Sequence, residues 1–124
     1  MTKYQYPAIF HKDKECGYWV EFPDWEKVNV GAFTDGKNYK QARYMAEDLL
    51  GLLCWDHETD HKIFPEPSKP EDHFAVGHLP GNFIAMISAD TDAYNQIMKF
   101  INKRHLYYRY RQINKAVERY KKWD

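Results

Sequence analysis

The feature that most constrains this chain is the alternation of apolar and polar residues between positions 4 and 33. The run 4–10 is rich in aromatic and branched residues, and the run 17–24 alternates large apolar residues with polar ones. A polar turn that ends in glycine separates the two runs, which is typical of a β-hairpin with one buried face. A third alternating run, 28–33, is followed by Thr-Asp-Gly at 34–36, which we expect to end it. The segment therefore predicts three antiparallel strands.

A helix is predicted directly after these strands. Asn38 is suited to cap it, and Gln41 three residues later completes a capping box. The pattern continues with one apolar stripe at helical spacing, formed by Ala42, Met45, Ala46, Leu49, Leu50 and Leu53. We expect this stripe to cover one face of the sheet and the helix to end near Cys54 or Trp55. Gln41, Glu47 and Asp48 lie off the stripe and should face solvent or a partner.

The rest of the chain contains a long connection, one more strand and a basic end. The connection at 56–81 holds four prolines, which favour extended backbone at the surface. The run 82–88 is apolar at almost every position, which predicts a strand buried on both faces in the middle of the sheet. The predicted fold class is α+β: a β-β-β-α-β domain at 1–90, with a three- to four-stranded, mainly antiparallel sheet, and a basic extension of one or two helices at 91–124.

Composition limits the functional classes. The chain has 124 residues, enough for one domain. Residues 1–98 carry 9 Lys/Arg against 16 Asp/Glu, whereas residues 99–124 carry 9 against 2. An acidic body with a basic end indicates a cationic partner for the first and an anionic partner for the second, or attraction between the two parts. Two isolated cysteines, with no signal peptide or long apolar span, favour a soluble cytoplasmic protein with reduced thiols and no membrane partner.

Four ordered motifs carry a resemblance to a known family. They are Tyr6-Pro7-Ala8, the Gly-Tyr-Trp-Val-Glu-Phe-Pro-Asp run at 17–24, the helix start at 36–42, and the Ile-Phe-Pro-Glu-Pro-Ser run at 63–68. In this order the motifs resemble HicB-family antitoxins over residues 4–88. The resemblance implies a β-β-β-α-β body often described as a partial RNase H-like fold. Two departures stand out: the family's Leu-Pro-Gly-Cys is missing after Pro23-Asp24, and residues 89–124 show no ribbon-helix-helix or helix-turn-helix pattern.

The resemblance also implies a function. HicB antitoxins of type II toxin–antitoxin pairs bind and neutralise HicA, a small basic toxin that cleaves mRNA, so we expect a binding protein that blocks the toxin sterically. It implies neither enzymatic activity nor a cofactor. A homodimer or higher homo-oligomer is the default for so small a regulator. From exposure and charge, rather than from a family motif, we expect the toxin contacts to be acidic and aromatic residues: Trp19, Glu21, Asp24, Trp25, Glu47 and Asp48.

The basic end offers an alternative function. Its cations, in particular Arg104, Arg109, Arg111, Lys115 and Arg119, are suited to contact the phosphates of operator DNA in a transcriptional regulator. The same region has an apolar stripe that would equally make an oligomer interface or pack on the body, with its charges solvated. The two interpretations are compatible, because a dimerising helix can carry a basic outer face.

A third possibility rests on a short motif. His57-Glu58-Thr59-Asp60-His61 matches the His-Glu-x-x-His signature of zinc hydrolases, which requires both histidines on one stable helical face. Here the motif follows the expected helix end, and Pro65 closes the segment. Phe64 and Pro67 also stand where one large class of these enzymes has Gly and a third His. We therefore expect a solvated loop rather than a metal-dependent hydrolase.

Overall fold

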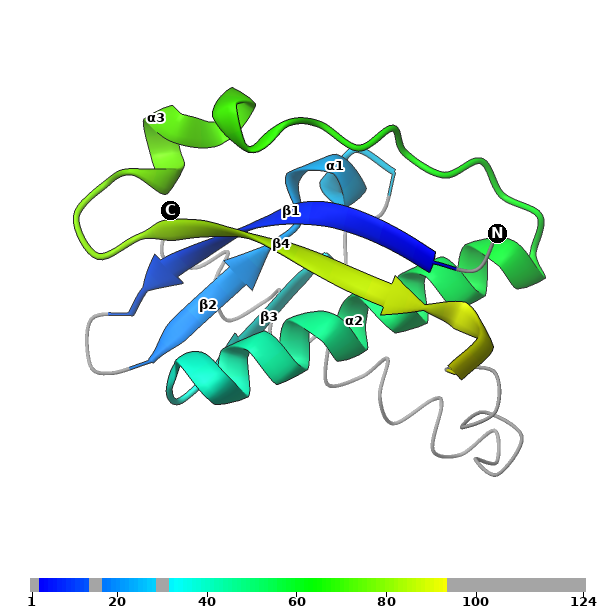
Figure 1. The fold of residues 1–124 in the computed structure, drawn as a ribbon, viewed down its shortest axis with the longest axis horizontal. Coiled ribbons are helices and arrows are strands. Elements are labelled where there is room, and N and C mark those ends of the chain that lie inside the picture. The colour runs from blue at the N-terminus through cyan, green and yellow to red at the C-terminus, as the bar shows by residue number, and fades with distance from the viewer. Residues whose placement is uncertain (1–2, 14–16, 29–31, 94–124) are drawn as a thin grey trace.

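The computed structural model describes residues 3–13, 17–28 and 32–93, and these form one sheet with a long helix against it (Figure 1). The strands are β1 (Lys3–Lys12), β2 (Tyr18–Glu21), β3 (Phe33–Gly36) and β4 (Phe83–Asp90). Their order in the sheet is β3-β2-β1-β4, and every neighbouring pair is antiparallel. The long helix is α2 (Tyr39–Thr59), and the short ones are α1 (Pro23–Glu26), η1 (Pro70–His73) and α3 (Phe74–Gly77). The predicted α+β class and the β-β-β-α-β order are confirmed.

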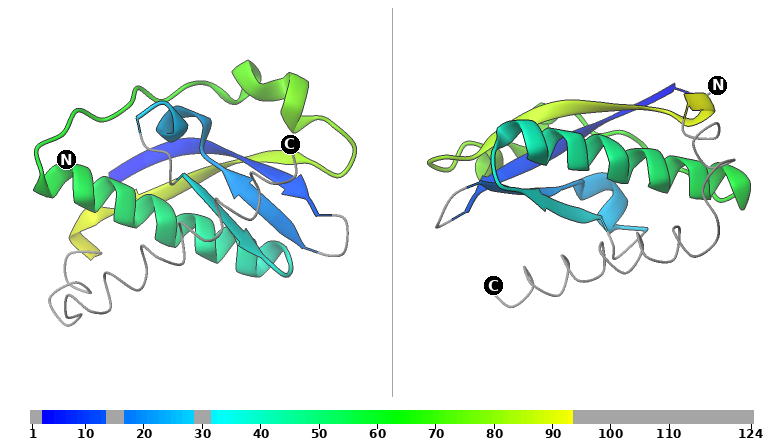
Figure 2. Two further views of the ribbon diagram at one scale, coloured as in Figure 1. Left: turned by 180° about the vertical axis from the view of Figure 1, so that it is seen from behind. Right: turned by 90° about the horizontal axis from the view of Figure 1, so that it is seen from below.

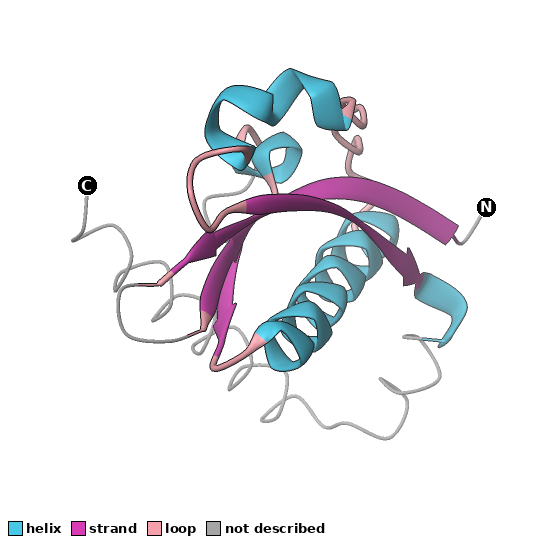
Figure 3. Cartoon of the chain, turned by 60° about the vertical axis from the view of Figure 1, so that its left-hand side comes forward, coloured by secondary structure: helices cyan, strands magenta, loops and turns pink. Residues whose placement is uncertain are grey.

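The two faces of the sheet are covered differently. The long helix α2 lies on one face, here called the inner face, and the three short helices lie on the other, the outer face (Figures 2 and 3). The inner face contributes the main core, which contains Tyr6, Ala8, Phe10, Val20 and Ile87 from the strands and Ala42, Ala46, Leu49, Leu50 and Leu53 from α2. The predicted helical stripe is thus the buried side of α2, except for Met45, which is only half-buried.

The start of α2 has the Asn38 cap that the sequence predicts, but the Gln41 side chain bonds to a different backbone N–H from the one expected. The Gln41 backbone N–H donates to Asn38 Oδ1 at 2.9 Å, as an N-cap requires. The Gln41 side chain accepts from the backbone N–H of Lys37 at 2.7 Å, one residue before the expected donor. A Cβ added to Gly36 would lie 2.2 Å from the backbone nitrogen of Ala42, so this glycine lets β3 pass closely over the helix start.

Two strand predictions were wrong. The third strand is Phe33–Gly36, so it includes the Thr34–Gly36 stretch that was expected to end it, whereas Val28 lies outside it and is exposed while Thr34 is buried. The last strand, β4, lies at the edge of the sheet, not in its middle. Its apolar outer side is explained by α3, since the side chain of Ile84 occupies the space above Gly77.

The helix end was also misplaced, because α2 continues to Thr59 and ends in a Schellman motif. The backbone N–H of Lys62 donates to the carbonyl of His57 at 2.9 Å, and that of His61 donates to the carbonyl of Glu58 at 3.3 Å. His61 holds the left-handed position of this motif, with φ at 53°. The connection that follows is extended as far as Lys69, but it then forms η1 and α3, which the proline count did not predict.

Candidate partner-binding face

The outer face of the sheet presents an aromatic and polar cluster where β1 meets β2. Trp19 and His11 are cross-strand partners, and their rings stack with centroids 3.8 Å apart and planes 7° from parallel. His11 Nε2 lies 2.9 Å from Glu21 Oε1. Phe33 on β3 extends the aromatic surface, with its ring centroid 6.0 Å from that of Trp19. Trp19 is only half-buried, so the cluster offers a rigid aromatic contact.

Asn82 determines the tautomer of His11. Its Oδ1 accepts from the backbone N–H of Lys12 at 2.9 Å, and its Nδ2 donates to the carbonyl of Val76 at 3.2 Å. These two bonds orient the amide so that Nδ2 also donates to His11 Nδ1, at 3.3 Å. With Nδ1 facing the Asn82 amide, it is the Nε2–H of the ring that donates to Glu21. The position of the Trp19 stack is therefore set by hydrogen bonds from both sides of the imidazole.

Glu21 shares a second hydrogen bond with Glu26 at the end of α1. Burial, together with the hydrogen bond and the negative charge of Glu21, raises the pKa of Glu26 to about 8. Burial alone would raise the pKa of Glu21 too, but the hydrogen bonds with His11 and Glu26 outweigh it, and the pKa of Glu21 is lowered. At neutral pH the pair therefore holds one proton on Glu26 and one negative charge on Glu21.

Asp24 is a structural anchor rather than an exposed contact. It is 2% exposed, and its Oδ2 accepts from both the backbone N–H and the hydroxyl of Ser68, each at 3.0 Å. The Ser68 hydroxyl also lies 2.7 Å from His73 Nε2. These bonds fasten the connection between α2 and β4 to the start of α1. Asp24 and Ser68 belong to two of the family-like motifs, which therefore meet in space.

The order of these three groups is not that of a hydrolytic triad. In a triad the histidine stands between the carboxylate and the serine, and it takes the serine proton. Here the serine stands between, and its single hydroxyl proton is donated to Asp24. His73 Nε2 must then donate to the hydroxyl oxygen, so it does not act as a base toward Ser68.

Trp25, another expected contact, is fully buried. Its ring lies edge-on to Tyr6 at 5.2 Å, to His57 at 4.8 Å and to Phe64 at 5.8 Å. The expectation of exposure was therefore wrong for Asp24 and Trp25. Both residues follow Pro23, which starts a helical turn and directs them inward instead of continuing the exposed alternation of β2.

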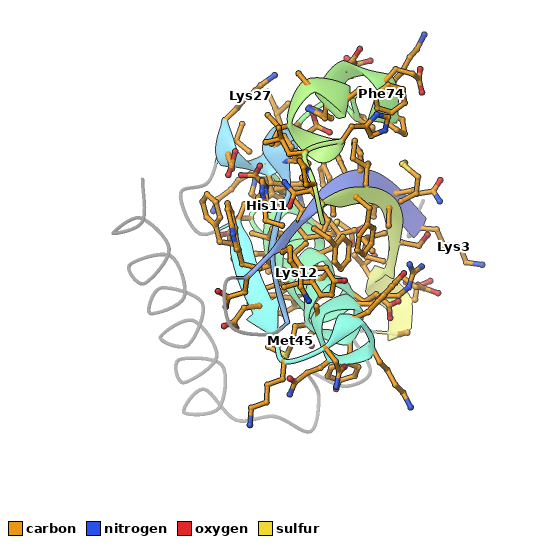
Figure 4. The ribbon with its side chains drawn as sticks, turned by 90° about the vertical axis from the view of Figure 1, so that its left-hand side faces the viewer. Lys3, His11, Lys12, Lys27, Met45 and Phe74 are labelled. Carbon is orange, nitrogen blue, oxygen red and sulfur yellow. The ribbon has the colours of Figure 1, made fainter. Side chains whose placement is uncertain are left out.

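The two remaining acidic candidates lie on the other layer of the molecule. Glu47 and Asp48 belong to α2, and Glu47 is exposed and pairs with Arg43 at 3.3 Å. Figure 4 shows the two layers: Met45 on α2 lies on one side of the sheet, while Lys27 and Phe74 lie on the other. Trp19 and Glu21 thus form one candidate surface, and Glu47 and Asp48 form another.

The His-Glu-x-x-His segment is structural. His57 lies inside α2 and is 4% exposed, which contradicts the expected solvated loop, whereas His61 lies beyond the helix end and is exposed. Burial lowers the pKa of His57, so it is neutral. Glu58 Oε1 accepts from the Tyr4 hydroxyl at 2.6 Å and from the Thr91 hydroxyl at 2.8 Å. Within the described residues, no group of three His, Cys, Asp or Glu side chains is arranged to hold a metal ion.

The connection carries an apolar surface that the sequence analysis missed. Phe74, Val76 and Leu79 are 42%, 41% and 52% exposed on and just after α3. The apolar residues at 74–79 were the signal for this surface in the sequence, but the prolines around them predicted extended backbone.

The predicted DNA contacts Arg104, Arg109, Arg111, Lys115 and Arg119 lie outside the described residues. In the described part of the chain, no helix is long and apolar enough to cross a membrane.

Comparison with solved structures places this arrangement among known folds. A chain of a toxin–antitoxin complex from Streptococcus pneumoniae is 26% identical, with a TM-score of 0.61 over 74% of this chain and 72% of that one. The N-terminal domain of the Burkholderia pseudomallei antitoxin HicB is 20% identical, with a TM-score of 0.55 over 70% of this chain and 99% of that one. The described body has a HicB-like fold.

A third solved structure has a similar fold. A chain of the HicA3 and HicB3 toxin–antitoxin complex is 21% identical, with a TM-score of 0.52 over 70% of this chain and 99% of that one. No family model matches the sequence, and no curated protein matches it. The HicB-like resemblance therefore rests on the four sequence motifs and on the fold.

Proposed function

We propose that this chain is the antitoxin of a type II toxin–antitoxin pair and that it binds and sterically neutralises a small HicA-like toxin that cleaves mRNA. The observation that carries the proposal is the HicB-like fold, shared with a 26% identical chain of a toxin–antitoxin complex. The protein acts by binding rather than by catalysis. Its place of action is the cytoplasm, where a toxin of this kind meets mRNA.

The acidic body suits a cationic partner, since complementary charge speeds association and selects the partner. We propose Trp19 and Glu21 as one contact surface and Glu47 and Asp48 as a second. The first offers a half-buried aromatic ring held by His11, together with a carboxylate that keeps its charge at neutral pH. The second offers an exposed carboxylate whose ion pair with Arg43 is weak and easily exchanged for a partner cation.

The experiment is co-purification of this chain with the small toxin encoded beside it, followed by affinity measurement on two variants. Trp19→Ala tests the outer face, and Glu47→Lys tests α2. Phe74→Ala is the matched aromatic control, and Glu71→Lys is the matched charge control on the connection. We expect a stable complex and at least a tenfold loss of affinity for each of the two variants Trp19→Ala and Glu47→Lys. Absence of a complex with the unaltered chain would contradict the proposal.

Operator binding by the basic segment remains a prediction. Loss of a salt-dependent DNA mobility shift on truncation after Asp92 would support it.

A further inference from the structure

An aromatic cluster lies at the end of the sheet where α2 begins. The end of β1, the starts of β2 and β4 and the first turn of α2 come together there (Figure 1), and Figure 4 looks onto this end of the molecule. Phe83 of β4 stacks on Phe10, with ring centroids 4.7 Å apart. The rings of Tyr18 and Tyr39 lie 5.4 and 5.2 Å from that of Phe83. Tyr18 is half-buried and Tyr39 is 36% exposed, so the cluster extends from the core to the surface.

Cations border the exposed side of this cluster. The Lys12 ammonium lies 4.9 Å from the centre of the Tyr18 ring, which is a cation–π contact. The Arg43 guanidinium donates to the Tyr39 hydroxyl at 3.0 Å. Four of the eight Lys and Arg residues that the structure describes lie at this end, in a body that is acidic as a whole: Lys12, Lys37, Lys40 and Arg43.

The first two turns of α2 add a second aromatic ring, which faces solvent. Tyr44 is 67% exposed and lies on the side of α2 away from the buried stripe. Residues four positions apart are neighbours on a helix surface, so Tyr44 lies beside Lys40 just as Tyr39 lies beside Arg43. The helix thus presents aromatic and cationic side chains alternately, next to the aromatic cluster.

A single strand of nucleic acid carries both kinds of group that this surface binds. Its unpaired bases have flat faces that stack on aromatic rings, and its phosphates are neutralised by Lys and Arg. A duplex presents the phosphates but hides the faces of its bases. An acidic peptide presents carboxylates without bases to stack. The alternation of rings and cations therefore favours a single strand over these other anionic partners.

Glu47 marks the limit of this surface along α2. Its carboxylate pairs with Arg43 at 3.3 Å, and the two side chains are 49% and 41% exposed. An exposed ion pair of this kind is weak, so Arg43 can exchange it for a phosphate. Glu47 then keeps its charge for a cationic partner, and the two surfaces on α2 do not exclude each other chemically.

We propose that a single strand of nucleic acid binds this end of the body, with bases stacked on Tyr39 and Tyr44 and phosphates held by the surrounding cations. All of these residues belong to the described body and are separate in sequence from the basic segment at 99–124. The inference goes beyond the proposed function and does not depend on the toxin.

The first test measures binding of a fluorescent oligouridine of roughly eight nucleotides to the full chain by anisotropy. We expect Tyr44→Ala to weaken binding at least roughly fivefold, because each stacked base contributes this much or more. Tyr44→Trp restores a ring and should bind as tightly as the parent chain. Phe74→Ala, which removes an exposed ring on the outer face, should have no effect. Thermal unfolding checks that each variant is folded.

The same variants are measured with oligothymidine and with a duplex of equal length. The basic segment at 99–124 is present in every variant and can contact the phosphates of either form. Loss of stacking should therefore weaken binding to the single strands and leave duplex binding unchanged, and the ratio of the two single strands identifies RNA or DNA as the preferred ligand. No binding by the parent chain, or equal weakening of single strand and duplex by Tyr44→Ala, overturns the proposal.

The second test examines the phosphate contacts through their salt dependence. Each lost contact to a single strand reduces the slope of log affinity against log salt concentration by about 0.7. Lys40→Gln should show this reduction, whereas Lys27→Gln, at an exposed position after α1 on the other layer, should keep the parent slope. Equal slopes for Lys40→Gln and the parent chain would contradict the assigned phosphate contact.

The third test locates the strand on the chain. An oligouridine that contains 4-thiouridine is crosslinked by light to the full chain, and the modified peptides are identified by mass spectrometry. We expect crosslinks at Tyr39 or Tyr44. Crosslinks confined to the basic segment at 99–124 would show that the strand is held by charge alone at the other end of the sequence, and the proposed site would be wrong.

Discussion

The hydrogen bonds between Asp24 and Ser68 predict a measurable coupling between residues far apart in the sequence. Asp24 is almost fully buried and accepts two bonds from Ser68, and a hydrogen bond to a charged group contributes roughly 1.5–3 kcal/mol. Ser68 is only half-buried, so water can replace part of a lost bond, and we use the lower value. Asp24→Ala should therefore cost about 3 kcal/mol of unfolding free energy, and Ser68→Ala about 1.5 kcal/mol.

The assay is urea unfolding of the parent chain, the two single variants and the double variant. In the Asp24→Ala background, Ser68→Ala loses only its bond with His73, so it should cost about 1.5 kcal/mol less than in the parent chain, and this difference is the coupling energy. Glu66→Ala removes an exposed carboxylate from the same connection and should change stability by less than about 0.5 kcal/mol. Additive effects of the two substitutions, or an Asp24→Ala cost below about 1 kcal/mol, would refute the anchor role.

Three further predictions concern Glu26, His61 and Asn38. Because the folded-state pKa of Glu26 is raised to about 8, its proton stabilises the fold fully below the unfolded pKa, and this contribution is lost as pH rises through 8. Unfolding measured at pH 6 and pH 9 should thus show Glu26→Gln gaining stability relative to the parent as pH rises; a pH-independent difference would contradict this. His61→Gly should stabilise the fold by roughly 1 kcal/mol, because glycine adopts positive φ without strain, and so raise the midpoint of thermal unfolding. A lower midpoint would contradict this prediction. Asn38→Ala should cost about 1 kcal/mol in urea unfolding through the lost helix cap, and no change would contradict the cap.

The parts of the fold that follow a local rule could be predicted from the sequence. The hairpin follows from period-two alternation around a turn, and the buried side of α2 follows from its apolar spacing and its Asn38 cap. The edge position of β4 could not be predicted in the same way. An apolar run on both faces is equally compatible with a central strand and with an edge strand covered by a short helix, and here α3 supplies the cover over Ile84.

In the candidate site, too, the residues in regular elements could be predicted from the sequence and those placed by distant contacts could not. Trp19 and Glu21 continue a regular strand, so their outward direction was predictable. Asp24 and Trp25 follow a proline that starts a turn, and the partner of Asp24 lies 44 positions away. No local pattern reports a partner at that distance. His57 was misjudged for a related reason, since its burial depends on Trp25 and Phe64 from two other segments.

The measurement that tests the central claim most directly is rescue from the toxin in living cells. The small reading frame adjacent to this gene is expressed alone and together with this chain, while growth and mRNA integrity are followed. We predict growth arrest with mRNA cleavage for the toxin alone, and restored growth with intact mRNA when this chain is present. Arrest and mRNA cleavage that this chain does not relieve would contradict the antitoxin function.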